Sequence, residues 1–94
     1  MNSYHKGRAF EYRVINKLKN RFPIIIRSAG SHSPFDIICV SDKEIWFIQC
    51  KNKFVNIAPV PIPPCGKFFV CYPNGRKVVC ESVGTAECSE RIDL

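Results

Sequence analysis

Apolar positions near the start of the chain follow a helical period. Between residues 7 and 22 they recur every three or four positions, with basic side chains largely on the other faces, and this spacing predicts an amphipathic helix. Pro23 should end the helix, because the residue before a proline disfavours helical backbone. The apolar positions are Phe10, Val14, Ile15, Leu18 and Phe22.

The pattern changes to that of β-strands after this helix. Residues 24–28, IIIRS, are rich in β-branched side chains and predict a first strand. Residues 35–40, FDIICV, and 44–51, EIWFIQCK, predict two further strands that a polar turn joins into a hairpin. We expect Trp46, inside the last of these, to lie in the core or an interface.

The second half of the chain predicts a connection and another hairpin. Residues 55–66 are rich in proline and cannot continue a helix or a central strand, so we expect an extended surface connection. Residues 67–72, KFFVCY, and 77–81, KVVCE, flank an Asn-Gly turn, which favours a hairpin. The polar tail from Ser82 onward predicts a short irregular or helical end.

These elements predict an α/β fold in a single domain, residues 1–94, with a mixed, mostly antiparallel sheet and one main N-terminal helix. So short a chain has little helix to cover both faces of its sheet. An apolar face left in water would favour a homodimer. The expected contacts lie in the C-terminal hairpin, at Phe68, Phe69, Val70, Tyr72 and Val79.

Charge and segment composition narrow the partners. The formal net charge is +6, with 14 Lys and Arg against 8 Asp and Glu, which favours a polyanion such as DNA over a small-molecule substrate. The N-terminus lacks an apolar signal core, and no apolar run is long enough to span a bilayer. We therefore expect a cytoplasmic protein that does not contact membranes.

The six cysteines predict no zinc site. Cys39 and Cys50 lie in apolar strand segments and should behave as small hydrophobic residues. The others contain no CxxC pair, which a zinc site usually supplies. A single disulfide stays open, because cysteines of intracellular proteins pair in some organisms. These other cysteines are Cys65, Cys71, Cys80 and Cys88.

Polar residues inside the apolar hairpin raise the question of chemistry. Side chains alternate along a strand, so Gln49 and Lys51 should share a face. If the hairpin turns about Asp42 and Lys43, opposite residue numbers sum to 85, which sets Asp36 across from Gln49 at a Cβ separation of ~5 Å. Oxygens from both side chains would then reach one Mg²⁺ ion, with the Cys50 backbone carbonyl as a further ligand.

Two charged residues complete this candidate site. Lys51 would lie beside the metal-bound water and a scissile phosphate, where an ammonium stabilises developing negative charge. Glu11 shares the helix face of Ile15, Leu18 and Phe22, and an acid on a buried face needs a partner. Lys51 or a metal-bound water would be such a partner.

The segments GRAFEYRVINKL, IIIRSAGSHSPFDII and IWFIQCK together resemble the PD-(D/E)xK nucleases, most of all the archaeal Holliday-junction resolvases. The resemblance spans residues 6–52 in order and spacing. It implies a minimal restriction-endonuclease-like fold and cleavage of four-way DNA junctions by a homodimer that uses Mg²⁺ or Mn²⁺. It matches Glu11, Asp36 and Lys51 to the family's acids and lysine, with Arg27 as its strand arginine and Ser31 as its loop serine.

The chain departs from the resolvases in two places. Gln49 stands where they usually have glutamate, and QxK is similar to restriction endonucleases of the Mrr type. Prolines follow Lys51, where the family usually has a second helix. A restriction or nicking endonuclease and an inactive DNA-binding protein of nuclease fold therefore remain alternatives. The expected DNA contacts are Lys6, Arg8, Arg13, Lys17, Arg27, Ser31, His32 and Lys53.

Overall fold

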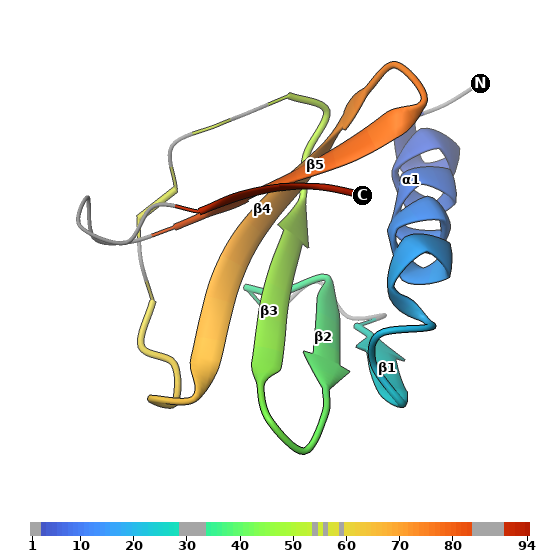
Figure 1. Cartoon of the computed structure of the whole chain (residues 1–94). Coiled ribbons are helices and arrows are strands. Elements are labelled where there is room, and N and C mark those ends of the chain that lie inside the picture. Colours follow the sequence, from blue (N-terminus) through green and yellow to red (C-terminus); the bar gives the residue numbers. More distant parts are fainter. Residues whose placement is uncertain (1–2, 29–33, 54, 56, 59, 84–89) are drawn as a thin grey trace.

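The computed structural model describes residues 3–28, 34–53, 55, 57–58, 60–83 and 90–94, which form one helix and a six-stranded sheet (Figure 1). The sheet is open and mixed, with strand order β1-β2-β3-β4-β5-β6. The elements are α1 (Ser3–Leu18), β1 (Ile24–Arg27), β2 (Ile37–Val40), β3 (Ile45–Cys50), β4 (Gly66–Asn74), β5 (Lys77–Ser82) and β6 (Arg91–Asp93). The expected α/β class, with one N-terminal helix and a mostly antiparallel sheet, is confirmed.

The helix is shifted toward the N-terminus relative to the predicted span of 7–22. It runs from Ser3 to Leu18, and a turn follows in which the Phe22 N–H donates to the Leu18 carbonyl at 3.1 Å. Pro23 therefore stands beyond the turn instead of ending the helix directly. Phe22 is still buried, so its apolar side chain extends the helical pattern without belonging to the helix.

The sheet has one parallel contact among four antiparallel ones. β1 and β2, β2 and β3, β4 and β5, and β5 and β6 pair antiparallel, whereas β3 and β4 run parallel. A parallel pair needs a crossover instead of a tight turn. The proline-rich connection after Lys51 supplies this crossover, and its described residues form no helix or strand up to Gly66.

The β2–β3 hairpin has the predicted register. Ile37 pairs with Ile48 and Val40 with Ile45, so paired residue numbers sum to 85. The Ser41 hydroxyl closes the turn, since it accepts bonds from the backbone N–H groups of Lys43 and Glu44 at 3.3 and 3.1 Å. This local capture of backbone donors is the reason that serine favours turns.

The β4–β5 hairpin turns one residue later than the Asn-Gly signal suggests. Asn74 pairs with Lys77, so Gly75 and Arg76 are the central residues of the turn. Gly75 has a φ of 64°, the positive value that type II′ turns require at their first central position. With this register Cys71 lies opposite Cys80, and the two form a disulfide.

The prediction of an irregular or helical C-terminal end is wrong for the last residues. Arg91–Asp93 form β6, which pairs antiparallel with β5 from Val79↔Asp93 to Glu81↔Arg91. The Ser82 N–H donates to the Glu90 carbonyl at 2.8 Å, at the point where the chain joins the strand. The segment is too short and polar to show a strand pattern in the sequence. It becomes a strand because pairing with β5 satisfies its backbone hydrogen-bonding groups.

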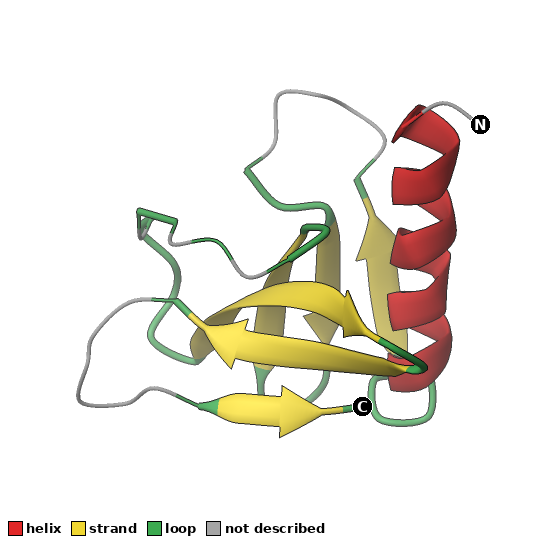
Figure 2. Ribbon diagram, turned by 90° about the horizontal axis from the view of Figure 1, so that it is seen from above, coloured by secondary structure: helices red, strands yellow, loops and turns green. Residues whose placement is uncertain are grey.

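The main core lies between α1 and one face of the sheet (Figure 2). Trp46 is fully buried at its centre, and its ring lies 5.1 Å from Phe22 and 4.6 Å from Phe69. The expected core position of Trp46 is thus confirmed. Cys39 is also buried, and burial raises the pKa of its thiol to about 12, so it behaves as the expected small hydrophobic residue.

The prediction that the C-terminal hairpin carries the dimer contact is wrong for most of the residues expected there. Phe68 is 4% exposed, and Phe69, Val70 and Val79 are buried as well. On the sheet face away from α1, the Phe68 ring packs at 5.0 Å on Phe35. The C-terminal hairpin therefore buries these apolar side chains within the chain itself and does not leave them for a partner.

No helix in the described part of the chain is long and apolar enough to cross a membrane.

Candidate active site

The candidate site lies where β2 begins and β3 ends. The Asp36 carboxylate accepts a hydrogen bond from the Cys50 N–H, with 2.8 Å between Oδ2 and N. The Asp36 N–H in turn donates to the Ile48 carbonyl at 2.8 Å, although Ile48 already pairs with Ile37. Two residues of one strand therefore face a single residue of the other, the arrangement of a β-bulge, which re-aims side chains at sheet ends.

This bulge changes the expected relation between Asp36 and Gln49. The regular register stops at Ile37↔Ile48, so the two residues are not a regular cross-strand pair. The Asp36 carboxylate lies level with the sheet backbone, because it bonds a backbone N–H of β3. Alternation along β3 puts Gln49 on the face opposite Cys50, and Cys50 packs against the core under α1.

Glu11 and Asp36 approach the same thiol. Burial raises the pKa of Cys50, and the carboxylates of Asp36 and Glu11 raise it further. The charges of both acids therefore act on the Cys50 thiol. The half-buried Cys50 thiol is therefore neutral at neutral pH.

The partner of Glu11 differs from the expected one. Arg27 Nε donates to Glu11 Oε1 at 2.8 Å, and these side chains are only 23% and 17% exposed. The Arg27 guanidinium also lies 5.2 Å from the centre of the Tyr12 ring. Neither Lys51 nor a metal-bound water is needed to offset the burial of the Glu11 charge, which corrects the expectation from sequence.

Lys51 follows directly on β3. Its N–H donates to the Cys71 carbonyl at 2.9 Å, so its backbone is held against β4. Its side chain is half-buried and forms no ion pair with any residue that the structure describes. No described acid therefore neutralises this ammonium. Lys51 directly follows Cys50, whose N–H binds the Asp36 carboxylate.

The Cys50 carbonyl points toward the same side of β3 as its N–H. The peptide between Cys50 and Lys51 is planar and trans, so its C=O and N–H point in opposite directions. Because the Lys51 N–H points to β4, the Cys50 carbonyl points to the β2 side, where Asp36 lies. A carboxylate oxygen, Asp36 Oδ1, and a backbone oxygen thus occupy one end of the β2–β3 pair.

This donor set fits a hard cation better than zinc. Mg²⁺ takes oxygen ligands, keeps several waters and commonly uses one or two carboxylates. The Asp36 carboxylate and the Cys50 carbonyl meet that requirement, and the Gln49 amide is the expected neutral addition. Among the described residues, no group of three or more His, Cys, Asp or Glu is arranged to hold a metal, which a zinc site would need.

The expected DNA contacts are spread over the surface. Arg8 and Lys17 are exposed on α1, and Lys53 is exposed after β3. Lys6 belongs to the first turns of α1, while Ser31 and His32 lie outside the described residues. Arg27 is paired with Glu11, so its charge is partly offset.

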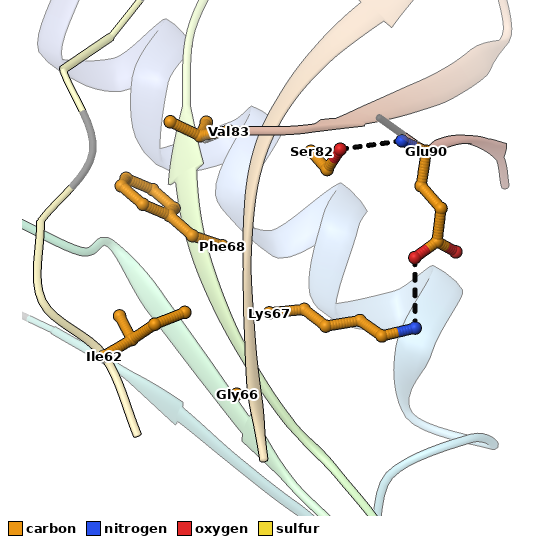
Figure 3. A pocket seen from close by; sticks show the side chains of 7 residues that line it. All are labelled: Ile62, Gly66, Lys67, Phe68, Ser82, Val83 and Glu90. Atoms are coloured by element: carbon orange, nitrogen blue, oxygen red, sulfur yellow. Dashed lines mark hydrogen bonds and ion pairs between the residues drawn. The ribbon is translucent and has the colours of Figure 1, made fainter. Parts of the chain in front are cut away.

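A hollow lies at the opposite end of the sheet from the candidate site. Figure 3 shows that Lys67 and Glu90 form an ion pair across it at 3.1 Å, and that the Glu90 N–H donates to the Ser82 hydroxyl at 2.7 Å. Its lining offers one exposed ion pair and no unpaired acid. It is therefore a weaker candidate than the end of β3. The remaining lining residues are Ile62, Gly66, Phe68 and Val83.

Comparisons with family models, with curated proteins and with solved structures give no match to this chain. The resemblance to nucleases therefore rests on the motifs in the sequence.

Proposed function

We propose that the protein is a metal-dependent DNA endonuclease of restriction-endonuclease-like fold that cleaves four-way junctions. One observation carries the proposal. The Asp36 carboxylate is bonded to the Cys50 N–H at the end of β3. The charge of Glu11 acts on Cys50, and the ammonium of Lys51, one residue further on, forms no ion pair with the described residues. A carboxylate and a backbone oxygen at one strand end can bind a divalent cation, and a lysine beside them can stabilise the charge that develops during phosphodiester hydrolysis.

The order of elements supports the same proposal. A helix precedes three antiparallel strands, and a crossover then leads to a fourth strand parallel to the third. The nucleases that the sequence resembles usually have a helix after the lysine strand. Here the proline-rich crossover follows Lys51 at that point of the chain and joins the same pair of neighbouring strands.

Each residue of the site has a chemical role in this proposal. A bound Mg²⁺ or Mn²⁺ would polarise the phosphate and lower the pKa of a water molecule. Asp36 gives the site its negative charge, and the Cys50 N–H fixes the orientation of that carboxylate. Lys51 stabilises the negative charge that develops on the phosphate oxygens. Gln49 would add a neutral oxygen from the face of β3 opposite Cys50.

A homodimer is part of the proposal, because two symmetric cuts require two sites. Because the apolar side chains of the C-terminal hairpin are buried, the interface requires a different surface. β1 is an edge strand of the sheet, and its outward side chains Ile24 and Ile26 are 51% and 52% exposed. Edge strands with exposed apolar side chains readily pair with another chain, so we place the interface at β1.

A cleavage assay tests the proposal directly. The protein is incubated with a labelled four-way junction and, in parallel, with a linear duplex of the same sequences, in Mg²⁺ or in EDTA. We expect symmetric cuts in the junction with Mg²⁺ and none with EDTA. Equal cleavage of the duplex would point to a restriction or nicking endonuclease. Binding without any cleavage in Mg²⁺ or Mn²⁺ would contradict the enzymatic proposal.

One observation favours a second candidate, an inactive DNA-binding protein of nuclease fold. The Glu11 carboxylate is held by Arg27 at 2.8 Å, and position 49 carries an amide instead of an acid. Both features lower the negative charge available for a metal. Isothermal titration of Mg²⁺ separates the two candidates, because the inactive protein would show no binding that depends on Asp36.

A further inference from the structure

Arg13 joins two parts of the chain that are far apart in sequence. Its Nη2 donates to the Gly75 carbonyl at 2.9 Å and to the Lys77 carbonyl at 3.3 Å. These acceptors belong to the β4–β5 turn, whereas Arg13 lies in α1. The planar guanidinium therefore fixes the tip of this hairpin against the helix, and Figures 1 and 2 show the hairpin turn beside α1.

The contact brings further positive charge to α1. Arg76 is a central residue of the turn, Lys77 follows it, and both side chains are exposed. Lys17 lies one helical turn after Arg13, so the two share a face of α1. We define these four residues, Arg13, Lys17, Arg76 and Lys77, as the tip cluster.

No acid offsets this charge among the described residues. The acceptors of Arg13 are neutral carbonyls, and the other three residues of the tip cluster form no ion pair with described residues. The ion pairs among the described residues lie elsewhere: Glu11 with Arg27, Glu44 with Arg21, Glu90 with Lys67, and Asp93 with Arg91. A set of exposed like charges is stabilised by an anionic partner.

The tip cluster and the candidate site lie toward the same end of the sheet. Cys50, at the end of β3, pairs with Cys71, and β4 runs in the same direction for three more residues to Asn74 before the turn. The β2–β3 turn, with Lys43, lies at the opposite end (Figure 1). A polyanion cut at the end of β3 would therefore extend toward the Gly75–Arg76 turn.

We infer that the tip cluster binds the phosphate backbone of DNA, with the β4–β5 turn as a second arm beside α1. The inference rests on the proposed function, and it adds Arg76 and Lys77 to the residues that contact DNA. Arg13 has two roles, because its hydrogen bonds position the turn while its charge belongs to the cluster. The contacts are to phosphates and carry no sequence preference.

The test measures DNA affinity at several salt concentrations, in EDTA, so that cleavage plays no part. The slope of log K against log salt is negative, and each lost phosphate contact should make it shallower by about 0.9. The affinity at 0.1 M salt should then fall about eightfold for each contact. For R76Q combined with K77Q we expect a slope that is shallower by about 2 and an affinity for a linear duplex that is reduced by about 60-fold. Thermal melting verifies that the variant folds.

K43Q is the matched control, since it removes one exposed turn lysine at the other end of the sheet. We expect its slope and affinity to equal those of the wild type. R13K retains the charge but loses the two-acceptor geometry of the guanidinium. We expect it to weaken binding less than R76Q/K77Q does and to leave the salt slope nearly unchanged, a result that charge alone does not explain.

The outcomes separate this inference from the proposed function. If R76Q/K77Q binds DNA with the slope of the wild type, the tip cluster is not a DNA contact, whether or not the protein cleaves junctions. If the slope becomes shallower as expected but no DNA is cut, the inference stands and the endonuclease proposal fails. A wild-type protein that binds no DNA at low salt overturns both.

Discussion

The two hairpins of the sheet are closed in different ways. The β2–β3 hairpin is held at its open end by the bond between the Asp36 carboxylate and the Cys50 N–H. The β4–β5 hairpin is held by the Cys71–Cys80 disulfide and by Arg13 at its turn. The first uses one hydrogen bond, which orients the Asp36 carboxylate, whereas the second uses a covalent bond. We therefore expect chemistry at the β2–β3 hairpin and a structural, supporting role for the β4–β5 hairpin.

The parallel contact between β3 and β4 joins these two hairpins. Cys50 pairs with Cys71 across it, and the Lys51 N–H bonds to the Cys71 carbonyl. The residue that follows the Asp36-binding group is thereby fixed to the disulfide-bonded strand. The stable hairpin thus acts as the support for the end of β3, where the candidate site lies.

A large loss of activity is expected for a change at Lys51. Lys51→Ala removes a charge at the end of β3, and loss of one group that stabilises the transition state lowers rates by about 10²–10³-fold. Lys43→Ala, in the turn at the other end of the same hairpin, should cleave at the wild-type rate. Single-turnover cleavage of a junction measures both. Equal rates for the two variants would remove Lys51 from the site.

The next effect concerns the supporting hairpin. Replacing Cys71 and Cys80 together by alanine should lower the free energy of unfolding by about 2–3 kcal/mol, because the disulfide closes a short loop in the unfolded chain. Urea unfolding of the variant and of the wild type, each with and without reductant, gives this value. A wild-type protein that is indifferent to reductant would show that the bond does not support the fold.

The register explains why the sequence did not predict this disulfide. An Asn-Gly turn centred on residues 74 and 75 would set Cys71 opposite Val78, whereas the turn at Gly75–Arg76 sets it opposite Cys80. Moving the turn by one residue shifts the pairing by two residues, so Cys71 stays on the same face of the hairpin while its cross-strand partner changes from Val78 to Cys80. The Ser41–Glu44 turn leaves no such choice, because it has one polar segment between two apolar runs, and its register was predicted correctly.

Other parts of the fold depend on contacts between distant segments. The inward phase of Glu11 follows from helical spacing, but its partner Arg27 does not, because IIIR gives no sign of which side chains face the helix. β6 has three residues and becomes a strand only by pairing with β5. The bulge at Asp36 likewise arises from the bond to Ile48 and has no sequence signal of its own.

A smaller effect distinguishes a structural from a metal-binding role of Glu11. We expect a double-mutant cycle of Glu11→Gln and Arg27→Gln to give a coupling energy of about 1–2 kcal/mol, since the pair is charged, hydrogen-bonded and mostly buried. The exposed Lys67–Glu90 pair should give at most about 0.5 kcal/mol and serves as the control. Thermal or urea unfolding provides all values. Equal coupling in both pairs would argue against the structural role.

The smallest effect concerns Gln49. Gln49→Glu adds a negative charge beside Asp36, and a charge near a divalent ion should tighten Mg²⁺ binding by about fivefold or more. Isothermal titration of the two proteins with Mg²⁺ measures this shift. Titration curves that coincide would show that the side chain at position 49, on the face opposite Cys50, does not reach the ion.

The most direct measurement compares Asp36→Asn with Asp42→Asn in the same junction-cleavage assay. Asp36 is the acid bonded to the Cys50 N–H, while Asp42 is an exposed acid in the turn at the opposite end of the same hairpin. We predict that Asp36→Asn abolishes cleavage yet binds the junction nearly as well as the wild type, and that Asp42→Asn changes neither property. Cleavage by Asp36→Asn at a rate near that of the wild type would contradict the assignment of the active site.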